Sequence, residues 1–354
     1  GATVKGNLGS YRTHPHMQNR WKAVGRKLAF SCEGRGEAAR WRAMTRRKLK
    51  ELIGYGTMLQ AGLGPRITEE VVFDDYVRQR VEIQTEPGVV MPLYVLIPRD
   101  LPGPHPVVLA PHGHGSGGKM SVAGCREMPE VAERIDFYNK DYGVQFVRAG
   151  FITFCPDARG FGERQEKAAR DSILNSSCQY LNNMPLGQTV TGMWAWDMHR
   201  LIDYVQSRED CSPDRIGSAG LSGGGLQTMW ASALDQRIRC AVISGYMYGY
   251  KESLLDRHTN CSCNYVPHLY EYVDMGDIAA LIAPRPLLIE TGAGDAHNGA
   301  RGLANVRSQV RTIRKAYRLV DAQRMVRHHV FEGPHRWNGC QAIPWMKRHL
   351  AGRP

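Results

Sequence analysis

The chain has 354 residues, of which 42% are hydrophobic and 23% charged, which is ordinary for a globular enzyme and enough for one large domain with insertions. No apolar run reaches the roughly 18 residues of a membrane-spanning helix, so we expect no membrane partner. The formal net charge of +12 lies mostly near the N-terminus, where residues 11–50 hold 12 Lys and Arg against only Glu33 and Glu37.

Residues 1–66 form the predicted basic N-terminal arm, which is irregular at first and then helical. Residues 37–52 are rich in good helix formers, and Gly54 and Gly56 end the helix. The preferred interpretation is a helical arm with a solvated face, which can pack on a partner subunit in a homo-oligomer. Polyanion binding is the alternative, although no zinc-finger or RNA-binding pattern supports a nucleic-acid partner.

A hairpin is expected next, with strands at residues 76–84 and 89–97 joined by the turn Pro87-Gly88. After His105 the pattern alternates between short apolar runs and helical spacing. The expected strands are residues 106–110, 151–155, 215–221, 239–244, 286–290 and 325–331. The expected helices are residues 193–205, 224–234, 278–282 (capped by Asp277), 303–320 and 343–350.

This alternation predicts an α/β fold with a mostly parallel sheet and helices on both faces. In such sheets the chemistry gathers at the carboxyl ends of the strands. We expect residues 67–354 to form one catalytic domain, with the aromatic-rich residues 246–276 as a cap insertion.

Gly220-Leu221-Ser222-Gly223-Gly224 matches the G-x-S-x-G nucleophile elbow, between a predicted strand and a predicted helix. A sharp strand-to-helix turn exposes the central side chain and leaves no room for side chains two positions away, which explains the glycines. The motif predicts Ser222 as a nucleophile.

An acid and a base follow in the order that this elbow requires. Asp295 lies just after the strand predicted at residues 286–290, and His335 lies just after the strand predicted at residues 325–331. The predicted catalytic residues are therefore Ser222, Asp295 and His335.

The loop Pro111-His112-Gly113-His114-Gly115 follows the strand predicted at residues 106–110. We expect its backbone at Gly113 or His114 to form an oxyanion hole with the N–H of Gly223, while the two imidazoles shape the loop.

Residues 113–118 also fit the G-x-G-x-x-G dinucleotide fingerprint. That interpretation needs an acid ending a second strand about 20 residues later, but Glu130 and Glu133 lie in a helix-like stretch. We expect no nucleotide cofactor.

The nine cysteines show no disulfide pattern, which favours a reducing, cytoplasmic location. Cys261 and Cys263 form C-x-C, which lacks the two-residue spacing and the second ligand pair of a structural zinc site. No metal is expected.

Four aromatic residues are candidates for lining a substrate pocket, although core packing is an equally good interpretation for each. They are Trp194, Trp196, Tyr246 and Trp337.

Several segments together resemble the branch of the α/β-hydrolases that includes dienelactone hydrolase and acetyl xylan esterase-like proteins. The matching segments are RRKLKELIG (46–54), PHGHG (111–115), DARGFGERQ (157–165), DRIGSAGLSGGG (214–225) and CNYVPHLYEYVDMGDIAALIAPRPLLIETG (263–292). The resemblance implies an ester hydrolase with the catalytic residues named above and no cofactor. The elbow GLSGG differs from the GxSQGG of cephalosporin deacetylases and typical acetyl xylan esterases, and no proline-containing segment follows Asp295.

These observations predict a serine esterase that acts through an acyl-enzyme on small acyl esters, acetyl esters among them, of a sugar or an aryl alcohol. A peptidase or amidase of the prolyl-oligopeptidase type remains an alternative, although the chain has no room for a propeller domain. A non-catalytic, polyanion-binding protein on the same scaffold is the other alternative.

Overall fold

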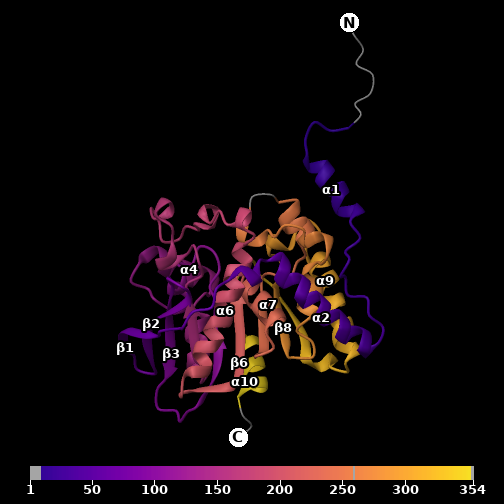
Figure 1. Ribbon diagram of the computed structural model, residues 1–354. Helices are drawn as coiled ribbons and strands as arrows, with labels where there is room; N and C mark the ends of the chain where they lie inside the picture. The colour runs from indigo at the N-terminus through magenta and orange to yellow at the C-terminus, as the bar shows by residue number, and fades with distance from the viewer. Residues whose placement is uncertain (1–8, 258–259, 352–354) are drawn as a thin grey trace.

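The centre of the computed structural model, which describes residues 9–257 and 260–351, is a nine-stranded mixed sheet (Figure 1). The strands are β1 (Arg66–Val72), β2 (Tyr76–Glu86), β3 (Val89–Pro98), β4 (His105–Leu109), β5 (Ile152–Pro156), β6 (Cys211–Leu221), β7 (Ile238–Ser244), β8 (Leu287–Gly292) and β9 (Val326–Phe331). Their spatial order is β1-β2-β3-β5-β4-β6-β7-β8-β9.

The first three strands form an antiparallel meander at one edge of the sheet. β2 and β3 pair across Pro87-Gly88, as the turn predicts, and β3 pairs antiparallel with β5. β1 was not among the expected strands, because its residues are nearly all exposed and show no apolar alternation. It forms through backbone pairing with β2 alone.

The remaining pairs, from β5 through β4 to β9, are all parallel. The predicted mostly parallel sheet is therefore confirmed. The helices are α1 (His14–Ala23), α2 (Arg35–Leu52), α3 (Lys119–Val122), α4 (Pro129–Tyr138), α5 (Tyr142–Arg148), α6 (Val190–Ser207), α7 (Gly223–Leu234), α8 (Met275–Ala280), α9 (Leu303–Leu319) and α10 (Ala342–Leu350).

Helices cover both faces of the sheet, as the alternation of buried side chains along each strand requires. On β7, Ala241 and Ile243 pack with α6, α7, α8 and α9, whereas Cys240 and Val242 pack with α5 and α10. The carboxyl ends of the parallel strands are left to the loops, which form the functional edge.

One helix cap differs from the sequence prediction. Asp274, not Asp277, is the N-cap of α8, and its side chain accepts the N–H of Met275. Asp277 instead occupies the N3 position of the capping box, and its carboxylate accepts the N–H of Asp274.

The two helices of the N-terminal arm differ in how they contact the domain. α2 contacts α7 and α9 and buries Trp41 and Leu49. The guanidinium of Arg46 donates to the carbonyls of Ala233 and Leu281, at 2.9 and 2.8 Å. α1 buries no residue and extends from the body of the molecule (Figure 1). Residues 1–8 of the predicted arm lie outside the described residues.

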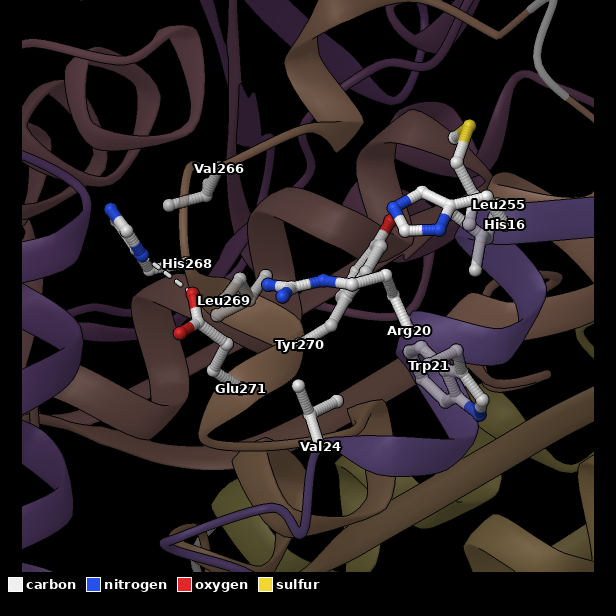
Figure 2. A pocket seen from close by; sticks show the side chains of 11 residues that line it. His16, Arg20, Trp21, Val24, Leu255, Val266, His268, Leu269, Tyr270 and Glu271 are labelled. Atoms are coloured by element: carbon white, nitrogen blue, oxygen red, sulfur yellow. Dashed lines mark hydrogen bonds and ion pairs between the residues drawn. The ribbon is translucent and has the colours of Figure 1, made fainter. Parts of the chain in front are cut away.

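A groove of about 350 Å³ separates α1 from residues 266–271 (Figure 2). Trp21 of α1 packs edge-on against Tyr270 at a centroid distance of 5.2 Å. None of the predicted catalytic residues lines this groove.

The predicted cap, residues 246–276, runs from β7 to the start of α8 as short single turns above the carboxyl ends of the strands (Figure 1). Residues 258 and 259 of this segment lie outside the described residues. Among the described helices, none combines the length and apolar character needed to cross a bilayer.

Candidate active site

The Ser222 elbow connects β6 to α7, and Ser222 occupies the N-cap of the helix. Its backbone has φ 59° and ψ −115°, in the positive-φ region that non-glycine residues rarely adopt. The Ser222 N–H donates to the carbonyl of Ser244 at 2.8 Å, and its own carbonyl accepts from Leu226 at 2.9 Å. The hydroxyl therefore projects from a bend whose backbone is hydrogen-bonded on both sides.

The flanking glycines are required by close backbone packing, as the motif predicts. A Cβ at Gly220 would lie 2.4 Å from backbone atoms of Gly224, and a Cβ at Gly224 would lie 2.3 Å from the carbonyl oxygen of Pro111. Side chains at these positions would push the elbow out of shape.

The loop after β4 lies directly against the elbow. A Cβ at Gly113 would be 2.8 Å from the Leu221 carbonyl and 3.1 Å from the Gly223 nitrogen. Within the described residues, no protein acceptor is recorded for the backbone N–H of His114 or Gly223. Two N–H groups beside Ser222 are thus available to a ligand.

His112 shapes this loop, as predicted. It is 1% exposed, its Nδ1 donates to the Gly113 carbonyl at 2.9 Å, and its Nε2 accepts the N–H of Ala158 at 3.1 Å. Burial lowers its pKa to about 4, so the imidazole stays neutral, and both ring nitrogens are used structurally.

Asp295 and His335 come together from the loops that follow β8 and β9. Nδ1 of His335 lies 2.6 Å from Oδ2 of Asp295, whose residue is 5% exposed. Although burial opposes ionisation of Asp295, hydrogen bonds from His297 and His335 hold its pKa well below the ordinary value. Burial lowers the pKa of His335, against the opposing effect of Asp295.

The loop that carries His335 is held by a buried carboxylate on β8. Glu290 of β8 is 1% exposed and accepts the N–H groups of Asn338 and Gly339 at 2.9 Å each. It also accepts the hydroxyl of Ser244 at 2.7 Å. Glu290 therefore connects β7, β8 and the His335 loop.

His297 belongs to the same group but was not predicted. Its Nδ1 lies 3.1 Å from Oδ1 of Asp295, its backbone N–H donates to that oxygen at 2.8 Å, and its ring lies 4.3 Å from the ring of His335. The only sequence signal was its place two residues after Asp295.

Two cavities meet at Ser222. The larger, about 390 Å³, is bordered by Ser222, Leu221, His335, His297, Gly113, His114, Gly115, Ser116, Arg134, Tyr138, Lys140, Tyr142, Leu174 and Asn175. The smaller, about 250 Å³, is bordered by His114, Ser222, Gly223, Tyr246, Tyr248, Asn260, Cys261, Asn264 and His297. Ser222, His114 and His297 border both, so the serine stands between two compartments.

The larger cavity has a cationic side that the sequence did not reveal. Lys140 is 7% exposed, and its ammonium donates to the carbonyl of His114 at 2.9 Å and the hydroxyl of Ser116 at 3.1 Å. Burial, reinforced by Arg134, lowers the pKa of Lys140 to about 7. No carboxylate lines this cavity among the described residues.

The four aromatic pocket candidates lie in different places. Tyr246 lines the smaller cavity, and its hydroxyl donates to Asn264 at 2.8 Å. Trp194, Trp196 and Trp337 line neither cavity. Their rings pack in the core and their N–H groups donate to Arg159, Thr85 and Gln145, which satisfies both halves of the indole.

Ser222 and His335 border one cavity, but no hydrogen bond joins them within the described residues. Such contacts are often long before substrate binds. The three predicted catalytic residues are therefore gathered at the carboxyl edge of the sheet, with the acid–base contact formed and the base–serine contact open.

Comparison with known proteins matches residues 13–344 to the Abhydrolase family. YtaP of Bacillus subtilis (strain 168), assigned as a hydrolase, is 31% identical over 242 residues, which are 67% of this chain and 76% of YtaP.

Solved structures share the whole fold. A Bacteroides fragilis NCTC 9343 protein assigned as an acetyl xylan esterase superposes with a TM-score of 0.82 at 19% identity, covering 99% of this chain and 97% of its own. A glucuronoyl esterase from Solibacter usitatus superposes with a TM-score of 0.63 at 16% identity, covering 88% and 93%. The chain has the α/β-hydrolase fold and belongs to the Abhydrolase family.

Proposed function

We propose that the protein is a serine carboxylic-ester hydrolase, in which Ser222 is the nucleophile, His335 the general base and Asp295 the residue that orients the base. The observation that carries this proposal is the position of Ser222. Its hydroxyl is presented on a positive-φ elbow, in a cavity shared with an imidazole whose other nitrogen lies 2.6 Å from a buried carboxylate.

The reaction begins when Ser222 Oγ attacks the ester carbonyl and His335 Nε2 takes the hydroxyl proton. Asp295 keeps Nδ1 protonated, so Nε2 is free to accept. The N–H groups of Gly223 and of the Gly113–His114 peptide stabilise the oxyanion.

His335 then returns the proton to the departing alcohol, which leaves an acyl-enzyme. A water molecule, deprotonated by the same imidazole, attacks the acyl carbonyl and releases the carboxylic acid together with free Ser222. No cofactor is required for this sequence.

The two compartments at Ser222 support a division of the ester between them. The smaller, about 250 Å³, suits a small acyl group such as acetyl, and the larger, about 390 Å³, suits a sugar or aryl alcohol. The structural neighbours are named as an acetyl xylan esterase and a glucuronoyl esterase, and these names support an ester of a carbohydrate as the substrate class.

A panel of p-nitrophenyl and acetylated-sugar esters tests the proposal, with aminoacyl amides included to detect peptidase activity. Ser222→Ala is expected to lose several orders of magnitude in kcat/KM, and the variant should not react with a fluorophosphonate probe. Ser308→Ala on α9, which lines neither cavity, is the matched control and should retain both properties. Undiminished ester hydrolysis by Ser222→Ala would refute the assignment.

A further inference from the structure

A cluster of three thiols and one imidazole lies beside the smaller cavity at Ser222. The ligand atoms of His114, Cys261 and Cys263 all lie within 4.8 Å of one another. Cys178 lies beside this group, in a turn (residues 178–180) that contacts the turn of residues 262–264. Three distant segments of the chain therefore bring three ligand atoms together, with a third thiol next to them.

The spacing within the cluster suits a tetrahedral ion. Zinc lies about 2.3 Å from thiolate sulfur and about 2.0–2.1 Å from imidazole nitrogen, which places those two ligands roughly 3.5 Å apart in a tetrahedron. Nε2 of His114 and Sγ of Cys263 are separated by 3.5 Å. Three cysteines and one histidine are a ligand set that structural zinc sites use.

The backbone is shaped to admit Cys178. Gly160, at φ +91°, lies so close that a Cβ there would be 3.3 Å from Sγ of Cys178. Ser177, next in the chain, is anchored to the Gly160 carbonyl by its N–H at 3.0 Å and its hydroxyl at 2.7 Å. Both Cys178 and Cys263 are buried, at 1% and 0% exposure.

Polar groups also surround the sulfurs. The side-chain amide of Asn264 lies 3.6 Å from Sγ of Cys263 and donates to the carbonyl of Cys261 at 3.1 Å. The hydroxyl of Ser176 lies 3.6 Å from Sγ of Cys261. Outer-shell hydrogen bonds of this kind orient metal ligands and stabilise thiolate charge.

We propose that Cys178, Cys261, Cys263 and His114 bind one Zn²⁺ ion in a closed, tetrahedral structural site. This differs from the expectation drawn from the C-x-C spacing, because the second ligand pair comes from residues 83 and 147 positions before Cys261. Binding releases the thiol protons to solvent and involves no redox step.

The ion would act on the shape of the active site. His114 belongs to the loop that lies against the Ser222 elbow, and His114, Cys261 and Asn264 all line the smaller cavity. A metal bridge between them fixes the width of that compartment. The site stands on its own ligands, so it does not depend on the chemistry proposed for Ser222.

Metal analysis of the reduced protein tests the site. After loading with Zn²⁺ and dialysis, the wild type is expected to hold about one equivalent by inductively coupled plasma mass spectrometry, and Ser222→Ala should hold the same amount. Cys261→Ser, at a partly exposed ligand, is expected to lose most of the zinc. Cys340→Ser, at an exposed thiol, is the matched control and should keep it.

Cobalt provides a second readout that does not depend on a variant folding. Co²⁺ in the wild type should show the thiolate-to-metal charge-transfer absorption and the strong visible bands of a tetrahedral thiolate site. The other ligand group, Asp295, His297 and His335, contains no sulfur and cannot produce that absorption. Wild-type protein that holds no zinc after loading, cobalt binding without the sulfur band, or a disulfide within the cluster in freshly reduced protein would each overturn the proposal.

Discussion

The rings of His297 and His335 lie 4.3 Å apart, tilted by 34°, and each approaches a different oxygen of Asp295. The Asp295 carboxylate therefore contacts two imidazoles, and His297 borders both cavities at Ser222. Only His335 follows the final strand, where the base of this fold is expected.

His297→Ala should separate the two imidazoles by function. His297 lowers the pKa of His335 electrostatically, so removing it should shift the acidic limb of kcat/KM to higher pH. Because Asp295 still holds His335, activity should fall only roughly tenfold, against several orders of magnitude for His335→Ala. Equal losses in the two variants, with an unmoved limb, would show that His297 is itself essential to the chemistry.

The pH dependence of the wild type follows from the burial of His335. Its pKa is lowered from 6.5, and the neutral imidazole is the form that accepts the serine proton. Activity should therefore be present above this pKa and be lost as the pH falls through it, with the acidic limb of kcat/KM centred below 6.5. A limb centred above that value, measured on a neutral ester, would contradict the assigned base or its environment.

Glu290→Ala should destabilise the fold as well as slow the enzyme. Three donors, two buried (Ser244 and Gly339) and one partly buried (Asn338), would lose their acceptor, at about 1–3 kcal/mol for each one left unsatisfied. We expect about 2–4 kcal/mol less stability, since water can reach part of the gap. Urea unfolding followed by circular dichroism measures this.

Glu332→Ala, at an exposed position in the same loop region, is the control and should change the free energy of unfolding by less than about 0.5 kcal/mol. A stability loss of equal size in both variants would mean that the hydrogen bonds of Glu290 are not the cause.

The cationic side of the larger cavity predicts a preference for anionic esters. Arg134 lines this cavity, so Arg134→Ala should lower kcat/KM for a carboxylate-bearing p-nitrophenyl ester by about fivefold or less, with little change for p-nitrophenyl acetate. Screening should reduce the difference at high salt. Arg126→Ala is the control, because Arg126 pairs with Asp136 and does not line the cavity. Parallel losses on both esters would argue against a charge effect.

The sequence predicted the central elements because they follow simple periodicities. β7 and β8 contain the short apolar runs 240–243 and 287–289, and α9 has apolar residues at helical spacing. β1 was missed because its exposed, charged residues carry no such pattern, and only pairing with β2 defines it. Tertiary context decides such edge strands.

The predicted site residues were those with a local signature. Ser222 has its glycine-flanked motif, and Asp295 and His335 follow strands in the required order. No local motif marks the roles of His297, Glu290 or Lys140. His297 packs against a ring 38 positions later, and Glu290 accepts from backbone groups 48 and 49 positions later. The environment of Lys140 depends on burial created by the fold.

β8 controls the alignment of both loops that meet at Asp295. The strand ends in the turn that presents Asp295, and through Glu290 it also fastens the backbone just beyond His335. The positions of the acid and of the base are therefore both set by β8. Insertions between α9 and β9 should consequently be tolerated far better than a one-residue slip of β8, which would reverse Glu290 to the other face and misplace both partners at once.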